Sequence, residues 1–327
     1  MAHNYTPEKR YFSYRRTVEA LLETGKSMTQ IKNRNRGWQR IFKLIIPYFI
    51  MVGIFQFIGM LITGVDIENI NGEISTINQL TISCFDLLGT FLILFIFMKV
   101  VDKEKFINLG FHTNERFSEF YLGVVLGAIL ILIGYFILMG LNQIKFEKIV
   151  FNPFELISSI LLFFIVAIVE ETLFRGYVLR NLMISANKYV ALIISSLLFT
   201  IMHGFNPNIQ YLGVVNLFLA GIFLGISYIH TKNLWFPIAL HFSWNLFQTH
   251  LGFNVSGQNA YSLIEFKIID NNMFNGGTFG FEGSILSIIF LLFAIVGIEL
   301  YFKKKLATKK NIVHLSDSTK NEDDSNK

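Results

Sequence analysis

The sequence predicts an all-α membrane protein, a polytopic bundle of about eight transmembrane helices with both termini in the cytoplasm. Of its 327 residues 53% are hydrophobic and 15% aromatic, and the mean hydropathy of +0.50 lies well above that of soluble globular domains. The apolar residues gather into long segments with polar stretches between them. In addition, lysine and arginine concentrate on one side of the membrane that these segments define.

Eight apolar segments are long enough, or nearly long enough, to form a membrane helix. They cover residues 44–63, 79–101, 119–140, 154–174, 189–203, 211–230, 234–250 and 284–302. The fifth segment is short for a span, and the fourth can continue as a helix beyond Arg175 because further apolar residues follow it. We therefore expect one transmembrane bundle over residues 44–302.

The orientation of the bundle follows from its positive charges. With the N-terminus inside, 25 of the 28 lysines and arginines lie on the cytoplasmic side and 3 on the outer side. Cytoplasmic loops of membrane proteins carry such an excess, so this split supports both the helix count and the orientation. We expect a multi-pass protein of the cell membrane, and the Ile-, Asn- and Phe-rich composition points to a bacterium with AT-rich DNA.

Three polar segments lie outside the predicted helices. Residues 1–43 form a basic arm, which we expect to lie against anionic lipid headgroups. Nucleic acid is not an expected partner, because a basic segment beside a span is already explained by membrane orientation. Residues 303–327 are predicted to be a polar, disordered cytoplasmic tail. The Gly- and Asn-rich residues 251–283 are predicted to form a flexible external loop.

Two adjacent carboxylates, Glu170 and Glu171, stand at the end of a long apolar run. An ionised carboxylate near the centre of a membrane helix costs about 2.5 to 3.5 kcal/mol on insertion scales. In a helix Glu171 lies one turn from Arg175 on the same face, so these two charges can neutralise each other. Glu170 points about 100° away and needs a group from another helix. The alternative is that both acids are hydrated at the membrane interface.

Two later apolar segments also carry polar residues. Phe199 precedes His203 by one helical turn, so its ring can support the imidazole. His241 precedes Asn245 by the same spacing, which places an imidazole and a carboxamide side by side on one helix face. Taken alone, the first motif is typical of a packing histidine, and the second fits an interhelical hydrogen bond equally well.

Together these groups supply what a hydrolase needs. A carboxylate, two imidazoles and an amide from three membrane helices provide a base that activates water and donors that hold a developing oxyanion. Each group is less costly in lipid when all of them line one water-filled cavity. We therefore predict a catalytic site formed by Glu170, His203, His241 and Asn245.

The three motifs, in this order, resemble those of the CPBP family of intramembrane proteases, also called the Abi or type II CAAX protease family. The matching residues are Glu170-Glu171-x-x-x-Arg175, Phe199-x-x-x-His203 and His241-x-x-x-Asn245. They lie within a predicted protease core of about residues 150–250, under a third of the chain. The resemblance implies an eight-helix membrane endopeptidase in which Glu171 and Arg175 form a structural ion pair.

The resemblance also implies a role for each remaining residue. Glu170 would activate water, His203 would assist it, and His241 with Asn245 would form the oxyanion site. The substrate would be a membrane-associated or small peptide or protein. Eukaryotic relatives remove the last three residues after a prenylated cysteine, a substrate not expected in a bacterium, and bacterial relatives are linked to bacteriocin self-immunity and to processing of small peptides.

Two other classes of function compete with a protease. A catalytically silent scaffold or immunity partner of the same fold would have no need for costly polar groups inside the membrane. A transporter is disfavoured, because the sequence shows no repeat with helices broken by Gly or Pro at matching positions.

The mechanism also has an alternative, because Glu170, His203 and His241 could bind a zinc ion and leave a fourth position open. The His-Glu-x-x-His pattern that arranges such ligands on one helix is absent from the sequence. The single cysteine, Cys84, excludes a multi-cysteine metal site. A carboxamide such as that of Asn245 is a poor zinc ligand but a good hydrogen-bond donor. We therefore favour metal-independent chemistry without a cofactor and keep zinc as the alternative.

Overall fold

The structure is a computed structural model that describes residues 36–65 and 74–325. Most of the predicted basic arm, and with it the expected contact with anionic lipid, lies outside the described residues. Its last part, residues 36–43, forms the first turns of helix α3, so this helix begins eight residues before the predicted apolar segment.

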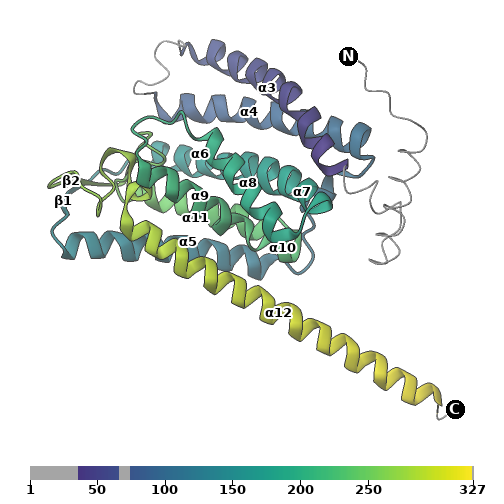
Figure 1. Ribbon diagram of the computed structural model, residues 1–327. Coiled ribbons are helices and arrows are strands. Elements are labelled where there is room, and N and C mark those ends of the chain that lie inside the picture. Colours follow the sequence, from purple (N-terminus) through teal and green to yellow (C-terminus); the bar gives the residue numbers. More distant parts are fainter. Residues whose placement is uncertain (1–35, 66–73, 326–327) are drawn as a thin grey trace, which may run out of the picture.

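Eight helices correspond to the eight predicted segments (Figure 1). They are α3 (Arg36–Thr63), α4 (Thr76–Phe97), α5 (Phe117–Gly140), α6 (Pro153–Glu171), α8 (Lys188–Met202), α9 (Tyr211–Gly225), α11 (Trp235–His250) and α12 (Ile285–Ser325). Within the described residues six helical runs are long and apolar enough to cross a membrane, while α8 and α11 have only 15 and 16 residues. The predicted membrane helix bundle is confirmed, and the orientation of its termini stays a prediction.

Short elements connect or extend these helices. They are η2 (Met98–Asp102), η3 (Phe106–Leu109), η4 (Thr172–Leu179), α7 (Arg180–Ser185), α10 (Tyr228–Thr231), η5 (Gly277–Phe279) and η6 (Phe281–Gly283). The most important is η4, a π-helical stretch that joins α6 to α7 in one helical run of 33 residues. The helix therefore continues beyond Arg175, and the π-helical stretch begins directly after the paired glutamates, where such irregularities often mark a functional site.

The helices pack in layers around α6 and α11. The hairpin of α3 and α4 covers α6 from one side, and α5 packs along α11 on the other (Figure 1). The approach of α5 to α11 is close because Gly123 and Gly127 face it, and a Cβ atom at Gly127 would lie 2.9 Å from the Leu240 carbonyl oxygen. Small residues permit such backbone contact between membrane helices. This packing fixes the helix that carries His241 and Asn245.

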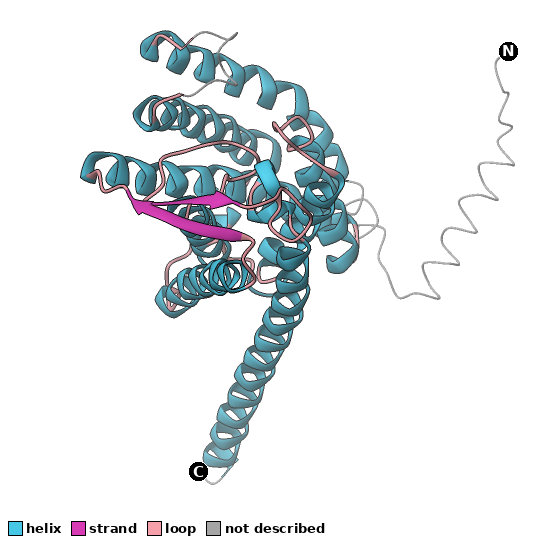
Figure 2. Ribbon diagram, turned by 90° about the vertical axis from the view of Figure 1, so that its left-hand side faces the viewer, coloured by secondary structure: helices cyan, strands magenta, loops and turns pink. Residues whose placement is uncertain are grey.

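Residues 251–283, hereafter the cap, are ordered, so the prediction of a flexible loop is wrong. Strand β2 (Ile264–Ile268) pairs antiparallel with β1 (Ile144–Ile149), which adds a two-stranded sheet to the otherwise helical fold (Figure 2). The cap also buries its own aromatic side chains, Phe253, Phe279 and Phe281. Five of its six glycines have a positive φ, as tight turns require, so they serve these turns rather than flexibility. Aromatic burial, which composition alone does not reveal, explains the difference.

Helix α12 continues to Ser325 and extends away from the bundle (Figures 1 and 2). Residues 303–325 of the expected disordered tail are thus helical in the structure, and residues 326–327 lie outside the described residues. No glycine or proline occurs between residues 303 and 325, so nothing in the sequence interrupts a helix that begins in the bundle.

Candidate active site

The predicted site residues come from three helices that meet in the bundle. Glu170 and Glu171 end α6, His203 caps the C-terminus of α8, and His241 with Asn245 lies in α11. Helix α11 packs against α6, and α8 packs against η4, the direct continuation of α6. The long helical run over residues 153–185 therefore holds both histidine-bearing helices.

Glu170 is the point where the groups converge. Its Oε2 atom lies 3.6 Å from Nε2 of His203 and 4.0 Å from Nε2 of His241. The Glu170 side chain is 25% exposed, more than the side chains of His203 (16%) and His241 (8%). Both separations exceed a direct hydrogen bond, and Oε2 is buried without a hydrogen-bond partner among the described residues, so the carboxylate and the two imidazoles face one another at close range.

The second ring nitrogen of each histidine, Nδ1, already has a hydrogen-bond partner within the protein. Nδ1 of His203 donates to the carbonyl oxygen of Phe199 at 2.8 Å, and a carbonyl oxygen can only accept. Nδ1 of His241 lies 2.9 Å from Oε1 of Glu171, a carboxylate that also pairs with Arg175. In each neutral ring the proton therefore sits on Nδ1, and the lone pair of Nε2 faces Glu170. Both histidines are thus arranged to accept a proton at the site.

Glu171 and Arg175 form a buried ion pair beneath these rings. The Arg175 Nη1 atom lies 2.7 Å from Oε1 of Glu171, and Nη2 donates to the Gly221 carbonyl oxygen of α9 at 3.1 Å. The guanidinium lies 4.7 Å from the centre of the Phe199 ring, which lies 4.3 Å from the centre of the His203 ring. The structure therefore places Glu171, Arg175 and Phe199 as a single support that contacts both histidines.

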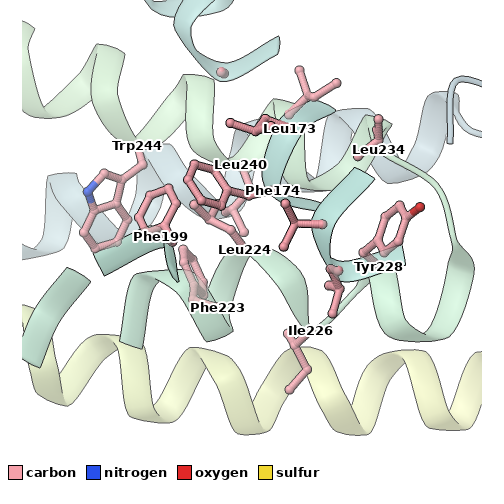
Figure 3. Packing of buried hydrophobic residues seen from close by; sticks show 14 of the residues in the cluster. Leu173, Phe174, Phe199, Phe223, Leu224, Ile226, Tyr228, Leu234, Leu240 and Trp244 are labelled. Atoms are coloured by element: carbon pink, nitrogen blue, oxygen red, sulfur yellow. The ribbon is translucent and has the colours of Figure 1, made fainter. Parts of the chain in front are cut away.

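Apolar packing surrounds this support. Phe199 meets Phe174 edge to face with 5.1 Å between ring centres, and Trp244 packs on Phe223 with 5.7 Å between ring centres (Figure 3). Asn245 follows Trp244 and is buried one turn after His241 on α11. The spacing along the helix places its carboxamide on the His241 face.

One acidic residue near the site was not predicted from the sequence. Glu282, in η6 of the cap, is buried and accepts hydrogen bonds from Trp244 Nε1 (3.2 Å) and from the backbone N and Oγ of Ser256 (both 2.9 Å). Burial raises the pKa of its carboxyl, and the bonds from Ser256 oppose that rise. The sequence contains one indication of this residue: Glu282 is the single charged residue in the aromatic and glycine segment 279–283.

The alternative to metal-independent chemistry is a zinc ion bound by Glu170, His203 and His241. Two imidazoles and a carboxylate are donors that zinc accepts, and each histidine already has the Nδ1 partner that orients a metal ligand. Even so, the described residues contain no group of three or more His, Cys, Asp or Glu side chains that could hold a metal ion. Glu170, His203 and His241 therefore do not form a metal-binding group in the described structure.

Comparison with known proteins bears on the same region. Residues 152–247 match the family model of the type II CAAX prenyl endopeptidases, Rce1-like. All three motifs, from Glu170 to Asn245, fall inside that match. This region is therefore similar to the type II CAAX protease, or CPBP, family. No curated protein and no solved structure matches the chain. The match supports a CAAX-type protease, and the six long apolar helices of the described residues support a multi-pass membrane protein.

Proposed function

We propose that this chain is an intramembrane endopeptidase that hydrolyses a peptide bond with a water molecule activated by Glu170. The observation that carries the proposal is the convergence of His203 Nε2 and His241 Nε2, from two other helices, on one oxygen of Glu170. Three titratable groups that face one another inside a membrane bundle are costly unless they serve water or a substrate.

The reaction follows from the hydrogen-bond partners. Glu170 removes a proton from water as the oxygen attacks the carbonyl carbon of the scissile bond, and a tetrahedral oxyanion forms. The amide of Asn245 can donate to that oxyanion at once. His241 donates only after Nε2 is protonated, because its Nδ1 proton is held by Glu171. The proton taken from water then passes to the leaving nitrogen as the C–N bond breaks, which gives a carboxylic acid and an amine.

We propose a membrane-associated or small peptide or protein as the substrate, and bacteriocin self-immunity or peptide processing in a bacterial cell membrane as the setting. The family match supports hydrolysis next to a lipid-anchored segment, since its model describes prenyl endopeptidases. The remaining candidate is a catalytically silent scaffold of the same fold. The orientation of both Nε2 atoms toward Glu170 favours the enzyme, because a scaffold gains nothing from that arrangement.

The test uses purified protein reconstituted in phospholipid vesicles. The probes are a quenched fluorescent peptide that ends in a farnesylated Cys-a-a-X sequence and the same peptide without the prenyl group, with products identified by mass spectrometry. We expect the parent to cleave at least one probe, Glu170→Gln to cleave neither, and Glu147→Gln, an exposed control on β1, to match the parent. Cleavage by Glu170→Gln at the parent rate would contradict the proposal.

A cellular comparison covers substrates that the probes miss. New peptide termini in membranes of cells that express the parent are compared with those of cells that express Glu170→Gln. Termini present only with the parent support the protease, and identical sets support the scaffold.

The zinc alternative is tested by exhaustive chelation of the active protein, followed by elemental analysis. We expect activity to persist without bound metal, because Glu170 and the two imidazoles supply the base and the proton carriers. Loss of activity that stoichiometric zinc restores would reassign His203 and His241 as ligands.

A further inference from the structure

Glu282 is a buried carboxylate for which the reaction above gives no role. Three donors satisfy it, the indole N–H of Trp244 on one oxygen and the N–H and hydroxyl of Ser256 on the other. A buried carboxylate with this many donors remains ionised at less cost than an unpaired one. If the cap only covered the helix bundle, an apolar residue at position 282 would be sufficient. The buried carboxylate therefore needs a further explanation.

The first connection of Glu282 leads to the proposed oxyanion residues. Trp244 stands between His241 and Asn245 in α11, and its ring packs on Phe223 and on Phe281 of the cap. The hydrogen bond from the indole to Glu282 therefore fixes the rotation of the helical turn that presents His241 and Asn245.

The second connection leads to the segment that follows His203. Ser256 precedes Gly257, whose carbonyl oxygen accepts a hydrogen bond of 3.2 Å from the Asn208 side chain. Gly257 has φ +80, and a Cβ atom there would lie 1.9 Å from the Pro207 carbonyl oxygen, so the cap backbone touches this segment directly. The segment begins at His203, whose carbonyl oxygen accepts from the backbone N–H of Asn206.

We propose that Glu282 is a positioning residue of the protease site, which couples the cap both to the turn that carries His241 and Asn245 and to the segment that begins at His203. The inference rests on the proposed function. Its carboxylate joins Trp244 of α11 to Ser256 of the cap, and Gly257, the next residue of the cap, contacts the segment after His203.

The experiment compares Glu282→Gln and Trp244→Phe with a matched control, Glu265→Gln. Glu265 lies in β2 of the same cap and pairs with Lys148 at the surface. The values of kcat and KM are measured in vesicles, well below the unfolding temperature of each variant. In parallel, carbethoxylation of each histidine by diethylpyrocarbonate is followed by mass spectrometry, with the exposed His112 as internal reference.

For Glu282→Gln we expect kcat to fall about 10- to 100-fold with KM unchanged, because a small misplacement of reacting groups has an effect of this size. The amide cannot accept all three hydrogen bonds, since its NH₂ group faces a donor. His203 and His241 should react faster with the reagent relative to His112, and Glu282→Asp, which keeps the charge, should recover part of kcat. Trp244→Phe should lower kcat while it leaves the Ser256 bonds intact.

The proposal would be overturned if Glu282→Gln had the same kcat and the same rates of histidine modification as the parent. It would also be overturned if the only change in Glu282→Gln were a lower unfolding temperature. If Glu282→Gln does not fold, Trp244→Phe decides by the same two measurements. Absence of probe cleavage by the parent, together with identical peptide termini in the cellular comparison, would refute the proposed function, and the histidine modification rates would still decide whether Glu282 positions the two rings.

Discussion

At the scale of single residues, the site depends on what each polar atom is bonded to. Glu171 is the clearest case, because one oxygen accepts from both Arg175 and His241. The sequence shows the first partner through its spacing of four but not the second, which lies 70 residues further along the chain. Glu171 therefore neutralises a buried arginine and also sets the tautomer of a histidine at the site.

The proposed roles predict a graded loss of activity. Glu170→Gln and His203→Ala should abolish detectable cleavage, because each removes a group that takes a proton. Asn245→Ala should keep a residual rate about 10² to 10³ times lower, since loss of one oxyanion donor has an effect of this size. Initial rates of the purified variants, normalised to folded protein, provide the measurement. Parent-like cleavage by Asn245→Ala would remove it from the oxyanion site.

The buried ion pair predicts a loss of stability. Glu171→Gln and Arg175→Leu each leave one buried charge without its partner, which costs about 3 to 5 kcal/mol in buried pairs. The side chains of Glu171 and Arg175 are at most 2% exposed, so solvent offers little compensation. The double variant should be less destabilised than the sum of the two single variants. Detergent-dependent unfolding of the three proteins measures this, and parent-like resistance of both single variants would contradict it.

At the scale of helices and strands, two features determine the positions of the site residues. The π-helical stretch η4 carries Arg175 and continues α6 toward α7, while the contact of α5 with α11 leaves no space for a side chain. His241 lies within the part of α11 that this contact holds. A change in the distance between α5 and α11 should therefore displace His241, even when no polar residue is substituted.

The glycine contact makes this testable. A Cβ atom at Gly127 would lie 2.9 Å from both the Leu240 carbonyl oxygen and the Trp244 nitrogen, so Gly127→Val should push the two helices apart. We expect a destabilisation of about 1 to 3 kcal/mol, as is usual for overpacking, together with a lower rate of cleavage. Gly53→Val on α3 is the control, because nothing lies within 4 Å of a Cβ there. Equal melting temperatures for the two variants would show that the contact is not tight.

At the scale of the whole molecule, the arrangement is a helix bundle closed at one end by the cap. The cap packs through Phe281 on Trp244 of α11 and through Gly257 on Pro207 of the segment after His203. The other end of the bundle carries the turn at residues 186–187 between α7 and α8 and the start of α11. The distribution of lysine and arginine predicts that this second end faces the cytoplasm.

This orientation predicts which residues a membrane-impermeant thiol reagent can reach. On a Cys84→Ala background, a cysteine at Lys267 in the cap should be labelled from outside intact cells. A cysteine at Lys103, between η2 and η3, should be labelled only after the membrane is opened, because it belongs to the positively charged side. The reverse pattern would invert the topology and place the cap in the cytoplasm.

The sequence by itself determined the helix bundle and the identity of the predicted site residues. Both depend on local patterns: apolar runs of membrane length, and spacings of four that place Glu171 beside Arg175 and Phe199 before His203. Those spacings fix which face of its own helix each side chain occupies. They carry no information on the helix that lies opposite.

Only the tertiary structure decided how those faces meet. The approach of His203 and His241 to Glu170, and the bond from His241 to Glu171, join residues from 33 to 71 positions apart. The order of the cap and the burial of Glu282 likewise arise from aromatic packing against helices distant in sequence. Contacts of this kind depend on the separation and rotation of packed helices, which helical periodicity leaves undetermined.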